Sequence, residues 1–390
     1  MLDSNISLRA QEITPFHVMD ILARAKKLEA QGIDIIHMEV GEPDFDTPQP
    51  IIDAGIEALK HGQTHYTPAL GLTELRQAIS DWYLSHYKVE VSPERIVVTP
   101  GASGGLLLIM GALLDRDKSV MLADPAYPCN RNFARFVEAK TQVVNVDESS
   151  NYQLTAESIE QFWNKDTEMA LIASPSNPTG TLLSADELTA LSNAVNAKQG
   201  HLVVDEIYHG LTYDGINAET VLSVNQHAFV INSFSKFFSM TGWRLGWVVV
   251  PEAYINVMDR LAQNLYLAAP TMSQYAALAA FKPETLAILE QRRQLLEQRR
   301  NCLIPALESL GLEIKATPQG AFYIYADCSK LLNEQFPDSM ALCQHWLHQA
   351  GVAVTPGNDF GEHLATHHLR FAYTVDEVRL LEAVERIKNI

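Results

Sequence analysis

One short stretch of the chain combines an amine, two hydroxyls and a guanidinium group in an order that suggests a specific chemistry. Lys236 closely follows Ser233 and Ser235, and Arg244 lies eight residues after the lysine. A lysine amine can condense with an aldehyde, while hydroxyls and a guanidinium group can bind a phosphate dianion. An aldehyde that carries a phosphate is pyridoxal phosphate. The stretch therefore predicts a site for this cofactor.

An acidic residue that could serve the same cofactor ends the apolar run 201–205. The run predicts a buried strand, and the carboxyl end of such a strand faces the crevice in which open α/β sheets bind ligands. Asp205 would pair there with the protonated ring nitrogen, and Tyr208 could hydrogen-bond the phenolic oxygen of the ring. The alternative is that Asp205 is only the N-cap of a helix that follows the strand.

The pattern S-x-S-K-x-x-x-x-x-G-x-R-x-G around Lys236 resembles the lysine motif of the class I and II aminotransferases, which are pyridoxal phosphate enzymes of fold type I. Further segments match the family in the same order between about residue 35 and residue 374. They are residues 41–45, 65–71, 100–105, 121–128, 170–181, 205–208, 318–323, 351–357 and 367–374. The resemblance implies an enzyme that moves an amino group from an L-amino acid to a 2-oxo acid by a ping-pong mechanism.

The resemblance also implies the remaining cofactor contacts. The turn at Gly101, Ala102 and Ser103 would present backbone N–H groups to the phosphate, as helix N-termini do, and a plain strand-to-helix turn is the alternative. Asn177 would donate to the phenolic oxygen, which favours the anionic form of that oxygen. Tyr127 would stack on the ring, with core packing as the alternative.

The resemblance implies that Arg370 binds the α-carboxylate of the substrate, a task that suits its planar fork, and a surface ion pair is the alternative. The resemblance adds the backbone of Gly41 and the side chain of Asn177 to the substrate-binding residues. It also implies that Tyr66 reaches the phosphate of a neighbouring subunit. The protein is therefore expected to be a homodimer with shared active sites.

The implied mechanism uses Lys236 as the general base and then the general acid for the substrate Cα proton. Asp205 and Tyr208 complete the catalytic set by stabilising charge on the cofactor. The same fold and residues serve C–S lyases that perform β-elimination, which is the alternative function. A non-catalytic, aminotransferase-like binding or regulatory protein is a further alternative, but such a protein would be expected to lose Lys236 or Asp205.

The sequence favours a neutral donor, aliphatic or aromatic, with 2-oxoglutarate or pyruvate as the acceptor. One branch of the family reads a dicarboxylate with an arginine after the lysine motif, but no arginine occurs between Arg260 and Arg292. Another branch uses a lysine just after the glycine turn, where this chain has Ser103. Because a hydrophobic pocket discriminates weakly between similar side chains, broad specificity is expected.

The order of apolar runs predicts an α/β fold, and the resemblance implies that it is pyridoxal phosphate fold type I. Seven strand-like runs occur between residues 96 and 250, mostly separated by helix-length segments, which indicates a mainly parallel seven-stranded sheet covered by helices. We expect a large cofactor-binding domain over residues 46–284. A smaller α+β domain would combine residues 285–390 with the N-terminal segment 1–45. A charged helix in which the sequence Leu-Glu-Gln-Arg-Arg occurs twice, at residues 289–293 and 296–300, is expected to be solvated.

The net charge of −18 argues against nucleic acid and anionic membranes as partners. Residues 1–10 lack the regions of a signal peptide, and no run reaches the length of a membrane span. Together with four scattered cysteines, this favours a cytoplasmic protein with reduced thiols. His363 and His367 are four residues apart, but no third ligand is evident, so no metal site is expected.

Overall fold

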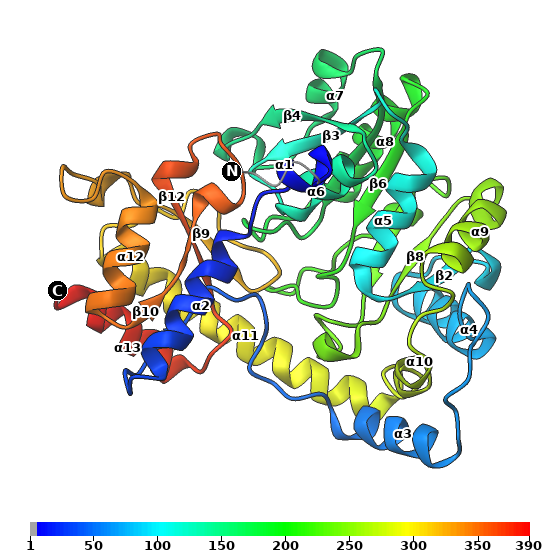
Figure 1. Ribbon diagram of the computed structural model, residues 1–390, viewed down its shortest axis with the longest axis horizontal. Helices are drawn as coiled ribbons and strands as arrows, with labels where there is room; N and C mark the ends of the chain where they lie inside the picture. The colour runs from blue at the N-terminus through cyan, green and yellow to red at the C-terminus, as the bar shows by residue number, and fades with distance from the viewer. Residues whose placement is uncertain (1–5) are drawn as a thin grey trace.

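The computed structural model describes residues 6–390, so the first five residues of the predicted N-terminal segment lie outside the described residues. Its centre is a seven-stranded sheet (Figure 1). In spatial order the strands are β2 (Ile96–Thr99), β8 (Gly246–Val249), β7 (Phe229–Ser233), β6 (His201–Asp205), β5 (Thr167–Ala173), β3 (Ser119–Asp124) and β4 (Lys140–Asn145). β8 runs antiparallel to both neighbours, and the other six strands share one direction. The predicted mainly parallel α/β sheet is confirmed.

Both faces of this sheet are buried, which explains why its strands are nearly continuous apolar runs. In β6, Val203 packs on one face, whereas Leu202 and Val204 pack on the other. The first face is covered by α5 (Gly101–Leu113), α6 (Cys129–Phe136) and α9 (Ile255–Leu265). The second is covered by α4 (Thr73–Trp82), α7 (Ala156–Phe162), α8 (Ala185–Ala197) and α10 (Thr271–Ala277). Helix α3 (Gln49–Lys60) lies beside α10 (Figure 1).

A second group of elements builds its own apolar core. Strands β11 (Thr355–Pro356), β12 (His368–Ala372) and β9 (Tyr323–Asp327) form an antiparallel sheet, and β1 (Ile36–His37) pairs in parallel with β10 (Val352–Ala353). Helices α2 (His17–Glu29), α12 (Ser339–Gln349) and α13 (Glu377–Lys388) pack around them (Figure 1). The segment from α2 to β1 thus folds together with the C-terminal part of the chain. The domain limits at residues 45/46 and 284/285 remain a prediction.

The charged helix expected after residue 283 is α11 (Pro283–Ser309), and it is more than a solvated helix. Leu289 and Leu296, which begin the two echoed segments, are each 1% exposed. Leu289 belongs to the core under the large sheet and Leu296 to the core of the second group. Further along, Arg299 forms two hydrogen bonds with Asp44, at 2.8 and 3.0 Å. The helix therefore connects the two cores.

The remaining elements are short. Helix α1 (Leu8–Glu12) packs against α6. Helical turns are η1 (Tyr83–Tyr87), η2 (Pro93–Arg95), η3 (Glu148–Ser150), η4 (Val221–Ser223), η5 (Thr241–Trp243), η6 (Glu252–Tyr254), η7 (Ser329–Leu331), η8 (Gly357–Asp359) and η9 (Ala365–His367). Within residues 6–390, no helix has both the length and the apolar character needed to cross a bilayer.

Candidate active site

The large sheet brings the predicted cofactor residues to one edge, because the carboxyl ends of its parallel strands meet there. Tyr127 follows β3, Asn177 follows β5, Asp205 ends β6 and Ser233 ends β7. A cavity of about 280 Å³ opens at this edge. The predicted site residues that line it are Gly41, Ala102, Ser103, Tyr127, Asn177, Asp205, Tyr208, Ser233, Ser235, Lys236, Arg244 and Arg370.

The amine of Lys236 faces this cavity from the loop after β7. Its Nζ donates a hydrogen bond to the carbonyl oxygen of Gly41 at 2.9 Å. It also lies 5.5 Å from the ring centroid of Phe322 and 5.7 Å from that of Tyr208. Among residues 6–390, the half-buried lysine therefore has one polar partner, a backbone carbonyl, which leaves the amine available to react with a ligand in the cavity.

Asp205 places a buried carboxyl group on the cavity wall. Burial raises its pKa to about 7, although the backbone N–H of Ile207 and the charge of Lys236 oppose this shift. A cationic ring nitrogen would offset the cost of burying the charged form. The N-cap interpretation is wrong, because the segment after β6 is a turn and Asp205 accepts from Ile207 within it.

Two further side chains that line the cavity, Asn177 and Tyr208, can donate hydrogen bonds to a ligand. The side-chain oxygen of Asn177 accepts from Nη1 of Arg370 at 3.0 Å, so its amide hydrogens are free for another acceptor. The hydroxyl of Tyr208 is buried, and burial raises the pKa of this phenol well above its usual value. Tyr208 therefore keeps its proton and can donate it.

The phosphate half of the site is shaped by close backbone approach. Helix α5 starts at Gly101, whose φ of +72° lies in the left-handed region. A Cβ there would lie 2.8 Å from Nη2 of Arg244, and a Cβ on Gly246 would lie 2.9 Å from the backbone nitrogen of Ala102. Because glycine has no side chain here, the first N–H groups of α5 stay accessible beside the guanidinium group of Arg244. Together these donors form an anion site. Ser233 and Ser235 also line the cavity with their hydroxyl groups.

Arg370 is held firmly in β12, which is buried along its whole length. Its guanidinium carbon lies 4.3 Å from the ring centroid of Tyr323 and 4.8 Å from that of Phe360. The group also donates to the carbonyl oxygen of Glu39 and, at 3.3 Å, to the hydroxyl of Thr355. This arrangement orients the planar fork towards the cavity and excludes a surface ion-pair role.

Of the predicted residues, Gly101 does not itself line the cavity but precedes the lining residue Ala102, whereas Tyr66 lies elsewhere. Its side chain is 84% exposed and lies in a different depression with Ala268, Pro270 and Met272. The hydroxyl of Thr271 donates to the backbone oxygen of His65 at 2.7 Å, so the two segments are adjacent.

The apolar wall of the cavity belongs to none of the predicted sequence motifs. Phe16, Val18 and Met19, at the start of α2, line it. The ring of Phe16 contacts Tyr127 edge-on, with centroids 6.1 Å apart. No local pattern marks these residues, because a distant group fixes them: the carboxylate of Asp359 accepts from the first backbone N–H groups of α2.

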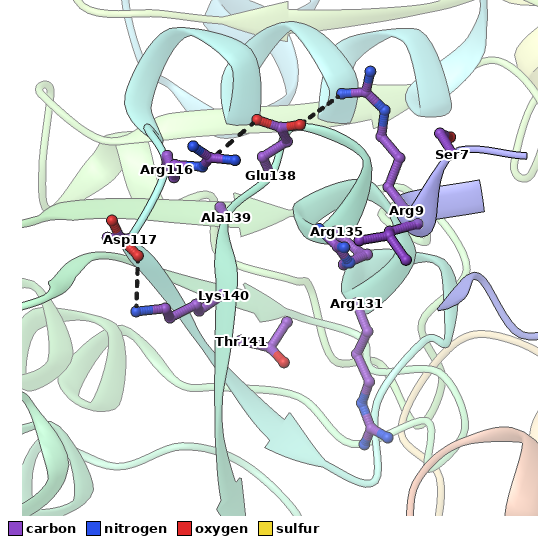
Figure 2. A pocket seen from close by; sticks show the side chains of 11 residues that line it. Ser7, Arg9, Arg116, Asp117, Arg131, Arg135, Glu138, Ala139, Lys140 and Thr141 are labelled. Atoms are coloured by element: carbon purple, nitrogen blue, oxygen red, sulfur yellow. Dashed lines mark hydrogen bonds and ion pairs between the residues drawn. The ribbon is translucent and has the colours of Figure 1, made fainter. Parts of the chain in front are cut away.

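A larger depression, of about 640 Å³, lies near the N-terminal helix α1 (Figure 2). It contains five basic side chains, and each of them lies within 4.0 Å of a carboxylate. Arg9 lies 3.1 Å and Arg116 4.0 Å from Glu138, and Lys140 lies 3.2 Å from Asp117. Arg131 and Arg135 likewise pair with acidic side chains. Size therefore does not identify the site; the smaller cavity contains the reactive groups.

The groups that line the smaller cavity fit pyridoxal phosphate. The cavity offers an amine for the aldehyde, a buried carboxyl for the ring nitrogen and two donors for the phenolic oxygen. It also offers an anion site made of helix N–H groups, hydroxyls and an arginine. Within the described chain, residues 6–390, no group of three or more His, Cys, Asp or Glu side chains could hold a metal ion.

Comparisons with known proteins agree with this chemistry. The profile of the family "Aminotransferase class I and II" matches residues 33–387. A (5-formylfuran-3-yl)methyl phosphate transaminase of Methanocaldococcus jannaschii is 36% identical over 387 residues, which cover 98% of this chain and 99% of that protein. The valine–pyruvate aminotransferase of Mycobacterium tuberculosis is 35% identical over 388 residues, which cover 99% and 98%.

Solved structures show the same relationship. An aminotransferase from Mycobacterium tuberculosis superposes with a TM-score of 0.95 at 34% identity, covering 99% of each chain. The aspartate aminotransferase of Thermus thermophilus with maleate superposes with a TM-score of 0.92 at 31% identity, covering 99% of this chain and 100% of that one. The chain belongs to the class I and II aminotransferases, pyridoxal phosphate enzymes that transfer amino groups between amino acids and 2-oxo acids.

Proposed function

We propose that this aminotransferase takes a neutral, aliphatic or aromatic L-amino acid as donor and a 2-oxo acid such as 2-oxoglutarate or pyruvate as acceptor. The observation that carries the proposal is the apolar wall of Phe16, Val18 and Met19. The basic side chains that line the cavity are Lys236, Arg244 and Arg370. Since each of these has a proposed task, none is left for a second carboxylate on the donor.

Three basic or acidic side chains have distinct tasks in this proposal. Pyridoxal phosphate, when bound, supplies an aldehyde and an electron-withdrawing ring. Lys236 removes the proton from the substrate Cα and later returns a proton, as general base and then general acid. Asp205 keeps the ring nitrogen protonated, and Arg244 holds the phosphate together with the start of α5 and the hydroxyls of Ser233 and Ser235.

Orientation of the donor is assigned to Arg370, which grips the α-carboxylate through two parallel hydrogen bonds. The backbone of Gly41 supports this grip, and its carbonyl oxygen accepts the hydrogen bond from the Lys236 amine. Asn177 links the two halves of the site, because its oxygen accepts from Arg370 while its amide donates to the phenolic oxygen beside Tyr208.

The proposal includes a homodimer in which Tyr66 completes the phosphate site of the partner subunit. The side chain is too exposed for a residue with a purely internal role. The same depression contains a further exposed apolar side chain, Met272, which is 37% exposed, together with Ala268 and Pro270. Such a cluster is typical of an interaction surface.

The test is a half-reaction. The absorbance of the purified, yellow holoenzyme is followed while single amino acids are added without an acceptor. Stoichiometric conversion to a band at shorter wavelength, reversed by 2-oxoglutarate or pyruvate, is expected for neutral donors. Conversion by aspartate alone would overturn the substrate proposal. Release of pyruvate from cysteine conjugates without conversion would identify a C–S lyase, and a protein inert to every donor would be a binding protein.

A further inference from the structure

Tyr323 is a buried cavity residue to which the proposed mechanism gives no task. Its side chain is 1% exposed, and its hydroxyl lies 2.9 Å from the hydroxyl of Tyr208. The two rings meet edge to face, with centroids 5.7 Å apart. Within residues 6–390, Tyr323 is the one hydrogen-bond partner of the Tyr208 hydroxyl. The pair therefore forms a short chain of phenols that ends in the cavity.

Tyr323 cannot swing away from this contact. Its ring packs against the guanidinium group of Arg370, 4.3 Å from the ring centroid. Its hydroxyl is so close to Gly41 that a Cβ on that residue would lie 1.9 Å from the phenol oxygen. The strand β9 fixes the backbone, since Tyr323 is paired with Ala372 of β12. The position of the hydroxyl is therefore set before any ligand binds.

The direction of the hydrogen bond between Tyr323 and Tyr208 follows from the role proposed for Tyr208. If Tyr208 donates its proton to the phenolic oxygen of the cofactor, its oxygen can only accept from Tyr323. A phenol that accepts one hydrogen bond is a stronger donor in another, because hydrogen bonds in a chain polarise one another. Burial of both groups strengthens this effect, since the local dielectric constant is low.

We propose that Tyr323 is a positioning residue that donates to Tyr208 and thereby strengthens the hydrogen bond from Tyr208 to the phenolic oxygen of the bound cofactor. The inference rests on the proposed role of Tyr208. Its consequence is measurable without turnover. Donors to the phenolic oxygen stabilise its anionic form, which lowers the pH at which the link between Lys236 and the aldehyde loses its proton.

The experiment is a pH titration of the visible absorbance of the holoenzyme. In Tyr323→Phe, the midpoint is expected to rise by roughly 0.3–1 pH unit, the size expected when one hydrogen bond is weakened rather than lost. In Tyr208→Phe the rise should be larger. The double variant should match Tyr208→Phe, because Tyr323 acts through Tyr208. An unshifted midpoint in Tyr323→Phe, or an additional rise in the double variant, would overturn the inference.

Tyr325→Phe is the matched control. Tyr325 lies two residues along the same strand, it is buried, and its hydroxyl has no hydrogen-bond partner in the described chain. The same loss of an oxygen atom should leave the midpoint unchanged, and an equal rise in this variant would contradict a specific role for Tyr323. If Tyr208→Phe itself leaves the midpoint unchanged, the proposed role of Tyr208 fails, and the inference fails with it. A shift in Tyr208→Phe alone rejects only the inference.

Discussion

At the scale of single residues, two neighbouring buried carboxyl groups differ in what surrounds their charged form. Asp205 and its neighbour Glu206 are both buried carboxyls, and burial raises their pKa to about 7 and about 8. Glu206 is satisfied on one oxygen by Thr220 and the backbone of Val221, while Asp205 faces the cavity. This difference separates a structural carboxyl from one that is poised to meet a cation.

Asp205 should make the stability of the cofactor-free protein depend on pH. Its folded pKa of about 7 lies above the usual value of about 3.9 for an unfolded aspartate, so the folded protein binds more protons between these values. Stability should therefore fall as pH rises through this window and level off above it. The variant Asp205→Asn lacks this titrating carboxyl group. As pH rises from about 5 to about 8, the melting temperature should fall more in the native protein than in Asp205→Asn. Parallel curves of melting temperature against pH would contradict the prediction.

Lys236→Ala should retain cofactor by its phosphate but lose turnover by at least roughly 10²–10⁴-fold, because the base for the Cα proton is gone. Rates of the half-reaction and cofactor content provide the measurement. Lys27→Ala, which removes an exposed lysine of α2, is the control and should react normally. Near-normal turnover in Lys236→Ala would refute the assignment of the base.

At the scale of elements, α2 is the part of the cavity wall whose placement depends on a distant residue. The helix has no cap within its own sequence neighbourhood. Instead, Asp359 of η8 accepts from the backbone nitrogens of His17 and Val18, at 2.8 and 3.3 Å. The carboxylate complements the positive end of the helix and so holds Phe16 and Met19 over the cavity.

Asp359→Ala should raise KM for bulky apolar donors by roughly 2- to 30-fold, the range that corresponds to the loss of a helix cap. An alanine donor should be less affected, because its methyl group makes little contact with the wall. The measurement compares KM for leucine, phenylalanine and alanine. Asp338→Ala, which removes the cap of α12, is the matched control, and KM should not change in that variant. Equal effects on all donors would argue against the wall as a specificity element.

At the scale of the whole molecule, the active site combines both cores and, in our proposal, two chains. The large sheet contributes the cofactor residues, while Arg370, Tyr323 and the start of α2 come from the second group of elements. Tyr66 is the predicted residue without a place in this arrangement. Its exposed position is understandable if a second subunit covers it.

Hybrid dimers test the shared site. Tyr66→Ala should weaken cofactor binding, because one phosphate contact is lost, and Lys236→Ala should be inactive. A hybrid of the two variants has one site that combines an intact Lys236 with the partner subunit's Tyr66. Mixed subunits should therefore recover activity at a low cofactor concentration at which neither parent is active. A hybrid dimer without recovery would show that Tyr66 does not act across the interface.

Local sequence patterns predicted the seven strands of the large sheet and most of the polar residues that line the cavity. Both follow from local information: strands buried on both faces are continuous apolar runs, and the chemical groups stand immediately after them. Asp205 could be predicted because the carboxyl end of a buried parallel strand faces the ligand crevice, whereas Lys236 was predicted from its local motif and Asn177 from the family resemblance. The site roles themselves await the experiments above.

Tertiary structure alone decided the features that depend on contacts between distant segments. Asp359 caps a helix more than 340 residues away, Tyr323 meets Tyr208 across 115 residues, and Leu289 and Leu296 of α11 enter two different cores. None of these contacts leaves a periodic or compositional trace in the sequence. They arise because long-range packing brings two side chains together, and this proximity is a property of the folded chain.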